Sequence, residues 1–291
     1  MVRADLHRDF CRHEGRRDEA SRRPRRNGNL RPLQGRLLSP AAHSQPEADW
    51  PPPVEILNEN GASDIVLICE HASNHIPASF ERLGLAPSEL QRHIAWDIGA
   101  AEVARELSRQ LDAICFLGTY SRLIIDLNRP LDSTTSIPVR SESTDVPGNI
   151  GIAPEDRDRR VSLIFNPFQD HVARHLDART SQGRKTRLVA IHSFTPVFLG
   201  ARRPWHAGVL FNRSREFAQN LIQGLGREAG LIVGANVPYV IDRQEDYAVP
   251  VHGEDRGLPA ILIEIRQDLI SPDVLEGHSL WATRLARALR S

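Results

Sequence analysis

Three continuous apolar runs, each followed by a polar segment, constrain most strongly how this chain can fold. They occupy residues 65–69, 188–191 and 260–263. Apolar runs of this length without polar alternation are typical of strands that helices cover on both faces. Two further runs, 123–125 and 208–211, look similar and predict additional strands.

The segments between these runs predict helices. Apolar residues recur at helical spacing within 100–111, 168–176, 217–225 and 280–289. Strands that alternate with helices indicate an α/β fold, in which helices flank a central mixed or mainly parallel sheet. We therefore assign residues 54–291 to a single α/β domain, a length that one domain can accommodate.

Charge is spread unevenly along the chain. The 37 Lys and Arg residues balance 37 Asp and Glu residues, yet residues 1–50 contain 11 Arg against 7 acidic residues. This segment lacks apolar periodicity and runs into three prolines, so we predict that residues 1–53 are a disordered arginine-rich extension with a proline linker. A passive extension, an anion- or nucleic-acid-binding arm and a transit peptide all fit it. The acidic balance of the remainder argues against a nucleic-acid partner for the folded domain.

The sequence also gives an expectation for location. No run approaches the roughly 18 apolar residues that a membrane-spanning helix needs, so no membrane partner is expected. The cysteines, Cys11, Cys69 and Cys115, are odd in number and lack metal-type spacing. Cys69 and Cys115 lie in apolar runs, which indicates buried thiols and, with them, a cytoplasmic protein.

Candidate catalytic residues follow the ends of the three main runs. His71 follows the first run, His192 the second and Glu264 the third. If the three strands are parallel, these side chains converge at the carboxyl edge of the sheet, where open α/β sheets bind their ligands. Two imidazoles can hold a divalent metal while a nearby carboxylate takes a proton from water. The sequence therefore predicts a hydrolytic metal site.

Arginines and turn residues indicate what this site binds. Arg122 and Arg129 flank an apolar stretch, and Arg203 lies in a later loop. A guanidinium group recognises carboxylates through two parallel hydrogen bonds, which favours a small anionic substrate. Residues 147–149, which end in Asn149, read as a turn that could line a pocket.

Five ordered blocks of the sequence resemble the N-formylglutamate amidohydrolase family. They are residues 70–74, 121–130, 191–196, 236–239 and 263–269, and the resemblance extends over about 65–289. It implies a fold like that of the zinc carboxypeptidases, with a central mixed sheet flanked by helices. It also implies hydrolysis of N-formyl-L-glutamate to formate and L-glutamate, a late step of histidine degradation.

The resemblance implies roles for individual residues. His71 and His192 would bind zinc or another divalent metal, and Glu264 would act as general base and then as general acid. Arg122 would polarise the scissile carbonyl or bind a second carboxylate. A further group is expected to bind the N-acyl amino acid substrate: Asn128, Arg129, Arg203, Asn149 and Ser193.

One position departs from the carboxypeptidase pattern. Those enzymes bind zinc through His-x-x-Glu, whereas Asn74 stands at the last position here. We expect Asn74 near the metal, although Glu70 or His75 could replace it. Two other functions remain open: hydrolysis of a different N-acyl amino acid by an amidohydrolase or deformylase on the same scaffold, and anion binding by a non-catalytic α/β protein.

Overall fold

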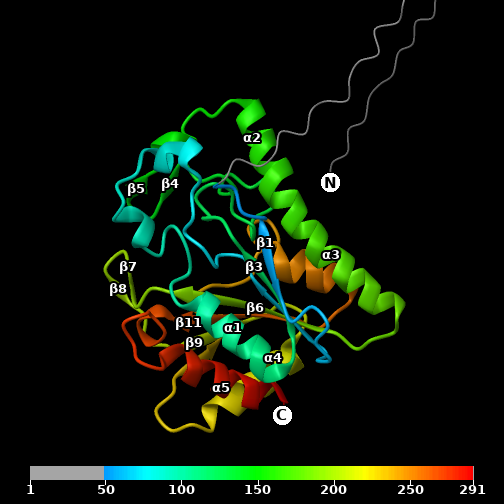
Figure 1. Cartoon of the computed structure of the whole chain (residues 1–291). Coiled ribbons are helices and arrows are strands. Elements are labelled where there is room, and N and C mark those ends of the chain that lie inside the picture. Colours follow the sequence, from blue (N-terminus) through cyan, green and yellow to red (C-terminus); the bar gives the residue numbers. More distant parts are fainter. Residues whose placement is uncertain (1–48, 291) are drawn as a thin grey trace, which may run out of the picture. The chain divides into compact units, whose positions relative to one another are not determined.

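The computed structural model describes residues 49–290, and a seven-stranded mixed sheet forms its centre (Figure 1). The strand order is β1-β3-β2-β6-β11-β9-β10. The four central strands β3, β2, β6 and β11 are mutually parallel, whereas β1 runs antiparallel to β3 and β9 antiparallel to β11. The strands are β1 (Val54–Leu57), β2 (Ile65–Cys69), β3 (Ile114–Gly118), β6 (Arg187–Phe194), β9 (Ala207–Leu210), β10 (Val233–Ala235) and β11 (Ala260–Arg266).

Two pairs of short strands lie outside this sheet. They form the hairpins β4 (Arg140–Ser141) with β5 (Thr144–Asp145), and β7 (Val197–Phe198) with β8 (Ala201–Arg202). Residues of both hairpins line the cavity described below.

Four of the five predicted strands are confirmed, as β2, β6, β9 and β11, and one prediction was wrong. Residues 123–125 form turns, although their side chains are fully buried in the core. The strand beside β2 is β3 instead, which comes from the equally apolar run 114–117. An apolar run shows that a segment is buried, but the hydrogen-bonded ladder depends on which segment reaches the neighbouring strand.

Helices cover both faces of the sheet. The helices are α1 (Ala100–Leu111), α2 (Pro154–Arg160), α3 (Asn166–Ser181), α4 (Arg215–Gly226) and α5 (Gly277–Arg290). Alternate strand residues pack against α1, α4 and α5 on one face, and the remainder pack against α3 and the loop 120–127 on the other. The predicted mixed α/β architecture with helices on both sides is thus confirmed, and α2 is an element that we did not predict.

The proline-rich segment is packed onto the domain. The Tyr120 hydroxyl donates to the carbonyl of Pro51 at 2.6 Å, and the Trp50 ring lies 5.5 Å from the Phe80 ring. Trp50 and Pro51, which we assigned to the extension and its proline linker, therefore contribute contacts to the domain. The rest of the predicted extension, residues 1–48, lies outside the described part of the chain. Within residues 49–290, no helix has the length and apolar character needed to cross a bilayer.

Candidate active site

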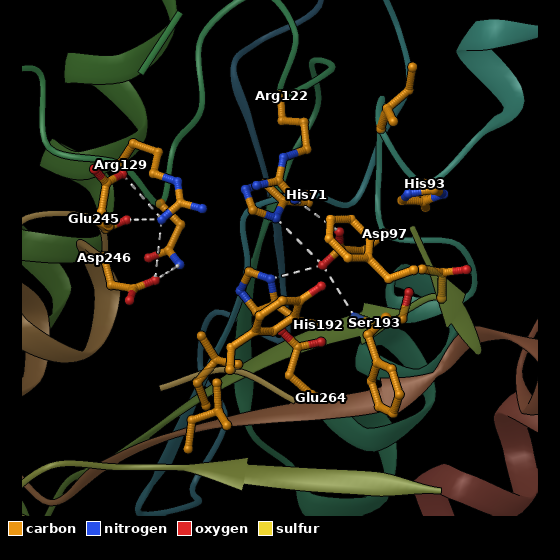
Figure 2. A pocket seen from close by; sticks show the side chains of 18 of the residues that line it. His71, His93, Asp97, Arg122, Arg129, His192, Ser193, Glu245, Asp246 and Glu264 are labelled. Carbon is orange, nitrogen blue, oxygen red and sulfur yellow. Dashed lines mark hydrogen bonds and ion pairs between the residues drawn. The ribbon is translucent and has the colours of Figure 1, made fainter. Parts of the chain in front are cut away.

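The parallel central strands bring the predicted catalytic residues together. In the register of β6 and β11, His192 lies directly opposite Glu264. Both side chains lie on the sheet face that α3 covers, and His71 follows the end of the parallel strand β2. The three residues line one cavity of about 450 Å³ (Figure 2). The convergence expected from parallel strands is therefore confirmed.

A buried carboxylate joins the two histidines. Oδ2 of Asp97 lies 2.8 Å from Nδ1 of His192 and 3.5 Å from Nδ1 of His71. One ligand atom from each of the three residues lies within 4.8 Å of the others. Two imidazoles and one carboxylate form the donor set of a catalytic zinc site, which leaves the fourth position open for water.

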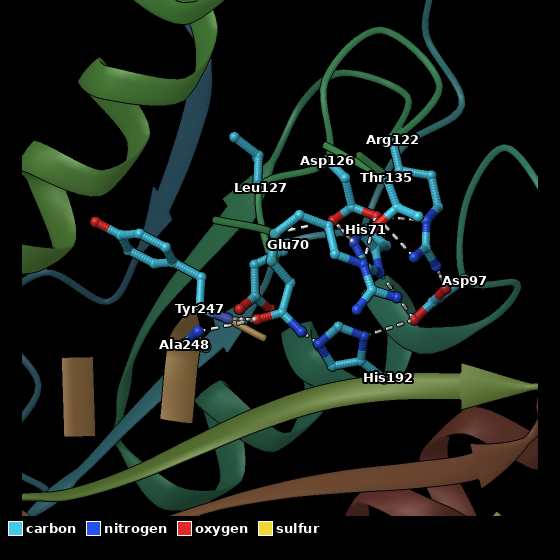
Figure 3. Close-up of polar contacts among 12 residues, drawn as sticks. Glu70, His71, Asp97, Arg122, Asp126, Leu127, Thr135, His192, Tyr247 and Ala248 are labelled. Atoms are coloured by element: carbon cyan, nitrogen blue, oxygen red, sulfur yellow. Dashed lines mark hydrogen bonds and ion pairs between the residues drawn. The ribbon is translucent and has the colours of Figure 1, made fainter. Parts of the chain in front are cut away.

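The second nitrogen of each imidazole faces another buried carboxylate (Figure 3). Nε2 of His71 lies 2.7 Å from Oδ1 of Asp126, and Nε2 of His192 lies 3.0 Å from Oε2 of Glu70. A carboxylate behind an imidazole fixes the ring orientation and increases the basicity of the opposite nitrogen. Nδ1 of His71 has no hydrogen-bond partner in the described structure. Both Nδ1 atoms are therefore presented as ligands, so the residues fit a divalent metal.

The charge balance supports the same fit. Four buried carboxylates lie here, those of Glu70, Asp97, Asp126 and Glu264. Among the described residues, the guanidinium of Arg122 contacts two of them, and that of Arg129 lies 3.9 Å from Asp126. Buried carboxylates are costly without positive charge nearby. Burial by itself would lower the pKa of His192, but Glu70 and Asp97 raise that pKa well above its ordinary value. A divalent cation would supply the missing positive charge while the imidazoles stay neutral.

Glu264 is a buried carboxyl group with an unusually high pKa. Its side chain lies in the cavity wall, and Oε2 lacks a hydrogen-bond partner among the described residues. Burial raises the pKa of Glu264 to about 8, although the positive charges of His192 and Arg122 oppose this shift. A carboxyl group that titrates near neutral pH can both accept and return a proton.

Arg122 is held against the site by two carboxylates. Its Nε and Nη2 donate to Oδ2 of Asp126 at 3.0 and 2.7 Å, and Nη1 donates to Oδ1 of Asp97 at 3.4 Å. Burial by itself would raise the pKa of Asp126, but Arg122 and His71 hold it well below its ordinary value. Asp126 therefore stays ionised and positions both the histidine and the arginine.

The predicted pair Asn128 and Arg129 also lines the cavity. Oδ1 of Asn128 accepts hydrogen bonds from the backbone of Tyr247 and Ala248, at 3.1 and 2.9 Å. Nη1 of Arg129 donates to the carbonyl of Glu245 and lies 3.8 Å from Oδ1 of Asp246. Asn128 thus anchors the loop whose acidic residues surround Arg129.

Ser193 lines the cavity, whereas Arg203 lies behind its aromatic wall. The hydroxyl of Ser193 donates to the carbonyl of Ile98 at 2.9 Å. The guanidinium carbon of Arg203 lies 4.7 Å from the Phe198 ring centre and 4.8 Å from that of Tyr239, whose hydroxyl accepts from Nη1 at 2.9 Å. Arg203 supports the aromatic wall instead of lining the cavity itself.

Besides Arg203, two predicted site residues lie outside the cavity lining, Asn74 and Asn149. Nδ2 of Asn74 donates to the carbonyl of Leu90 at 2.8 Å. Nδ2 of Asn149 donates to two backbone carbonyls, and its Oδ1 accepts a 2.6 Å hydrogen bond from Arg160. The structure therefore commits Asn149 to holding loops together. We expected Asn74 near the metal, but the residue that lies beside the two histidines is Asp97.

Asp97 is the functional residue that sequence reasoning missed. It stands three residues before α1, and an acidic residue at a helix start is normally explained by the helix dipole. Asp97 also accepts a 3.2 Å hydrogen bond from the Ser193 amide, which ties the start of α1 to β6. This contact joins residues far apart in the sequence, so no local pattern signals it.

An open mixed sheet with two carboxylate-backed histidines and a buried, unpartnered carboxyl oxygen at its carboxyl edge defines an α/β protein with a hydrolase-type site. The chain belongs to the N-formylglutamate amidohydrolase family, whose sequence model matches residues 63–271.

Solved structures share this fold. Gene product Atu2144 from Agrobacterium tumefaciens is 36% identical, with a TM-score of 0.78 over 82% of this chain and 93% of that one. The N-formylglutamate amidohydrolase from Ralstonia eutropha JMP134 is 18% identical, with a TM-score of 0.62 over 82% of this chain and 96% of that one. The search of curated proteins found no match.

Proposed function

We propose that this protein is a metal-dependent amidohydrolase of N-formyl amino acids. N-formyl-L-glutamate, which the family name gives, is the first substrate to test, and its hydrolysis would place the enzyme in histidine degradation. The observation that carries the proposal is the pair of histidines, each backed by a buried carboxylate, beside the unpartnered carboxyl group of Glu264.

Three residues would hold the metal, which we propose to be zinc or another divalent ion. They are His71 and His192 through Nδ1, and Asp97 through Oδ2. When bound, the metal supplies a Lewis acid and lowers the pKa of water. Asp126 and Glu70 keep the two imidazoles oriented for this task.

Glu264 would carry the proton in both halves of the reaction. It takes a proton from the attacking water, whose oxygen forms a bond to the formyl carbon. It then gives that proton to the amide nitrogen as the C–N bond breaks, which releases formic acid and the free amine. Transfer of the acid proton to the amine leaves formate and an ammonium group. Arg122 presents Nη1 toward Asp97 in the same cavity, so its positive charge can stabilise the oxyanion that forms.

The test combines metal content with formate release. The zinc-loaded protein should release formate from an N-formyl amino acid, and Glu264→Gln should lower kcat by at least about 100-fold, as expected for loss of a general base. Elemental analysis should show that Glu264→Gln still binds one equivalent of zinc. Glu155→Gln changes an exposed carboxylate on α2 and serves as the matched control. Full activity in Glu264→Gln would rule out the proposed base.

A further inference from the structure

The cavity contains fewer available positive charges than its arginines suggest. Arg122 uses three of its nitrogens to contact Asp126 and Asp97. Arg203 is stacked among aromatic rings behind the cavity wall. Of the three arginines expected to bind carboxylates, Arg129 alone lines the cavity without a hydrogen bond to a carboxylate of the described residues.

Arg129 is the arginine that is left to bind a carboxylate of the substrate. Its Nη1 donates to the carbonyl of Glu245, whereas Nε has no hydrogen-bond partner among the described residues. Figure 2 shows the guanidinium group beside Glu245 and Asp246, on one side of the cavity. We therefore assign this guanidinium to one carboxylate of the substrate, the α-carboxylate of an amino acid.

The surroundings of Arg129 are acidic. Oε2 of Glu245 lies 3.7 Å from Nη1 of Arg129, Oδ1 of Asp246 lies 3.8 Å from the same atom, and Oδ2 of Asp126 lies 3.9 Å from Nε. Asp242 and Glu142 line the same cavity. A second carboxylate on the substrate would meet these like charges and be repelled by them.

The carboxyl group of Glu264 gives separate evidence that this cavity binds a ligand. Oε2 of Glu264 is unpartnered, and the side chain is only 6% exposed. A buried polar atom that has no partner in a cavity wall indicates that a bound ligand supplies its hydrogen bond.

We infer that the amino-acid part of the substrate carries a single carboxylate, with a neutral or cationic polar side chain facing Glu245 and Asp246. This inference rests on the proposed function and narrows its substrate class, because N-formyl-L-glutamate carries two carboxylates. The amide of glutamine or the ammonium group of lysine would donate hydrogen bonds to these acidic side chains.

Three substrates that differ mainly in side-chain charge test the inference. N-formyl-L-glutamine is close in shape to N-formyl-L-glutamate, and N-formyl-L-lysine carries the opposite charge. Calorimetry on zinc-loaded Glu264→Gln protein gives their affinities, and formate release by the unaltered protein gives kcat/KM. We expect N-formyl-L-glutamate to bind at least about tenfold more weakly than both others, as repulsion from nearby like charges requires.

Glu245→Gln tests the origin of the preference. Glutamine can still accept the hydrogen bonds that Oε2 of Glu245 receives from Ser133 and Thr135, but it carries no charge. The preference for N-formyl-L-glutamine over N-formyl-L-glutamate should therefore shrink several-fold. It should stay unchanged in the Glu155→Gln control.

The two assays separate this inference from the proposed function. If the binding order holds but no formate appears with any substrate, the proposed reaction fails and the inference stands. Tightest binding of N-formyl-L-glutamate, or binding of none of the three compounds, overturns the inference.

Discussion

Asp97 contacts both histidines through a single oxygen, so its charge should matter more for metal binding than that of any other group in the loop before α1. We expect Asp97→Asn to weaken zinc binding by at least about 100-fold, because loss of a ligand should cost no less than loss of an outer partner. Asn74→Ala should leave the affinity unchanged, since its amide serves the Leu90 carbonyl. Titration against a competing chelator measures both variants.

If Asn74→Ala weakened zinc binding more than Asp97→Asn, Asn74 and not Asp97 would be the metal ligand.

Some residues of the candidate site could be predicted from the sequence, and others could not. His71, His192 and Glu264 could be predicted because each follows an apolar run, and parallel strands must bring such residues to one edge. Asp97 could not be predicted, because only tertiary packing places the start of α1 against β6.

At the scale of elements, the close approach of two backbones positions one wall of the cavity. Gly208 in β9 lies opposite Glu264 in β11, and the loop 236–240 crosses directly above it. A Cβ atom on Gly208 would lie 1.6 Å from the carbonyl oxygen of Val237. This loop carries Tyr239 and Val240, which line the cavity.

Gly208→Ala should therefore displace the loop. We expect a loss of about 1–3 kcal/mol in the free energy of unfolding, which is typical of overpacking, together with reduced kcat/KM for formate release. Gly226→Ala is the matched control, because a Cβ atom there meets nothing within 4 Å at the end of α4. Denaturant unfolding of the two variants tests the difference, and equal stability would contradict a loop fixed by close contact.

Some of the predicted strands form and one does not, and the difference lies in how the elements pair. Runs 65–69 and 188–191 became strands because parallel neighbours pair with them on both sides. The run 123–125 is equally buried, but it belongs to the loop that covers the sheet and carries Arg122 and Asp126. Hydrophobicity predicted the core well, whereas strand pairing depends on distant segments that the local sequence does not specify.

For the molecule as a whole, a buried histidine outside the candidate metal site should make stability depend on pH. The His252 side chain is buried below α3, and Nε2 lies 2.6 Å from Oε1 of Gln169. Burial lowers the pKa of His252 from 6.5 to about 4, and the nearby charge of Arg256 acts in the same direction. The folded protein therefore keeps this imidazole neutral at pH values where the unfolded chain protonates it.

The sign of the effect follows from this difference. The contribution of the neutral imidazole is complete above pH 6.5 and is lost as the pH falls toward 4, because the unfolded state then binds the additional proton. A difference of 2.5 pKa units corresponds to a loss of about 3 kcal/mol. Denaturant unfolding of metal-free protein measures the free energy of unfolding between pH 7 and 4. Its decline over this range should be larger by this amount in the unaltered protein than in His252→Gln. Parallel curves for the two proteins would show that His252 titrates alike in the folded and unfolded states.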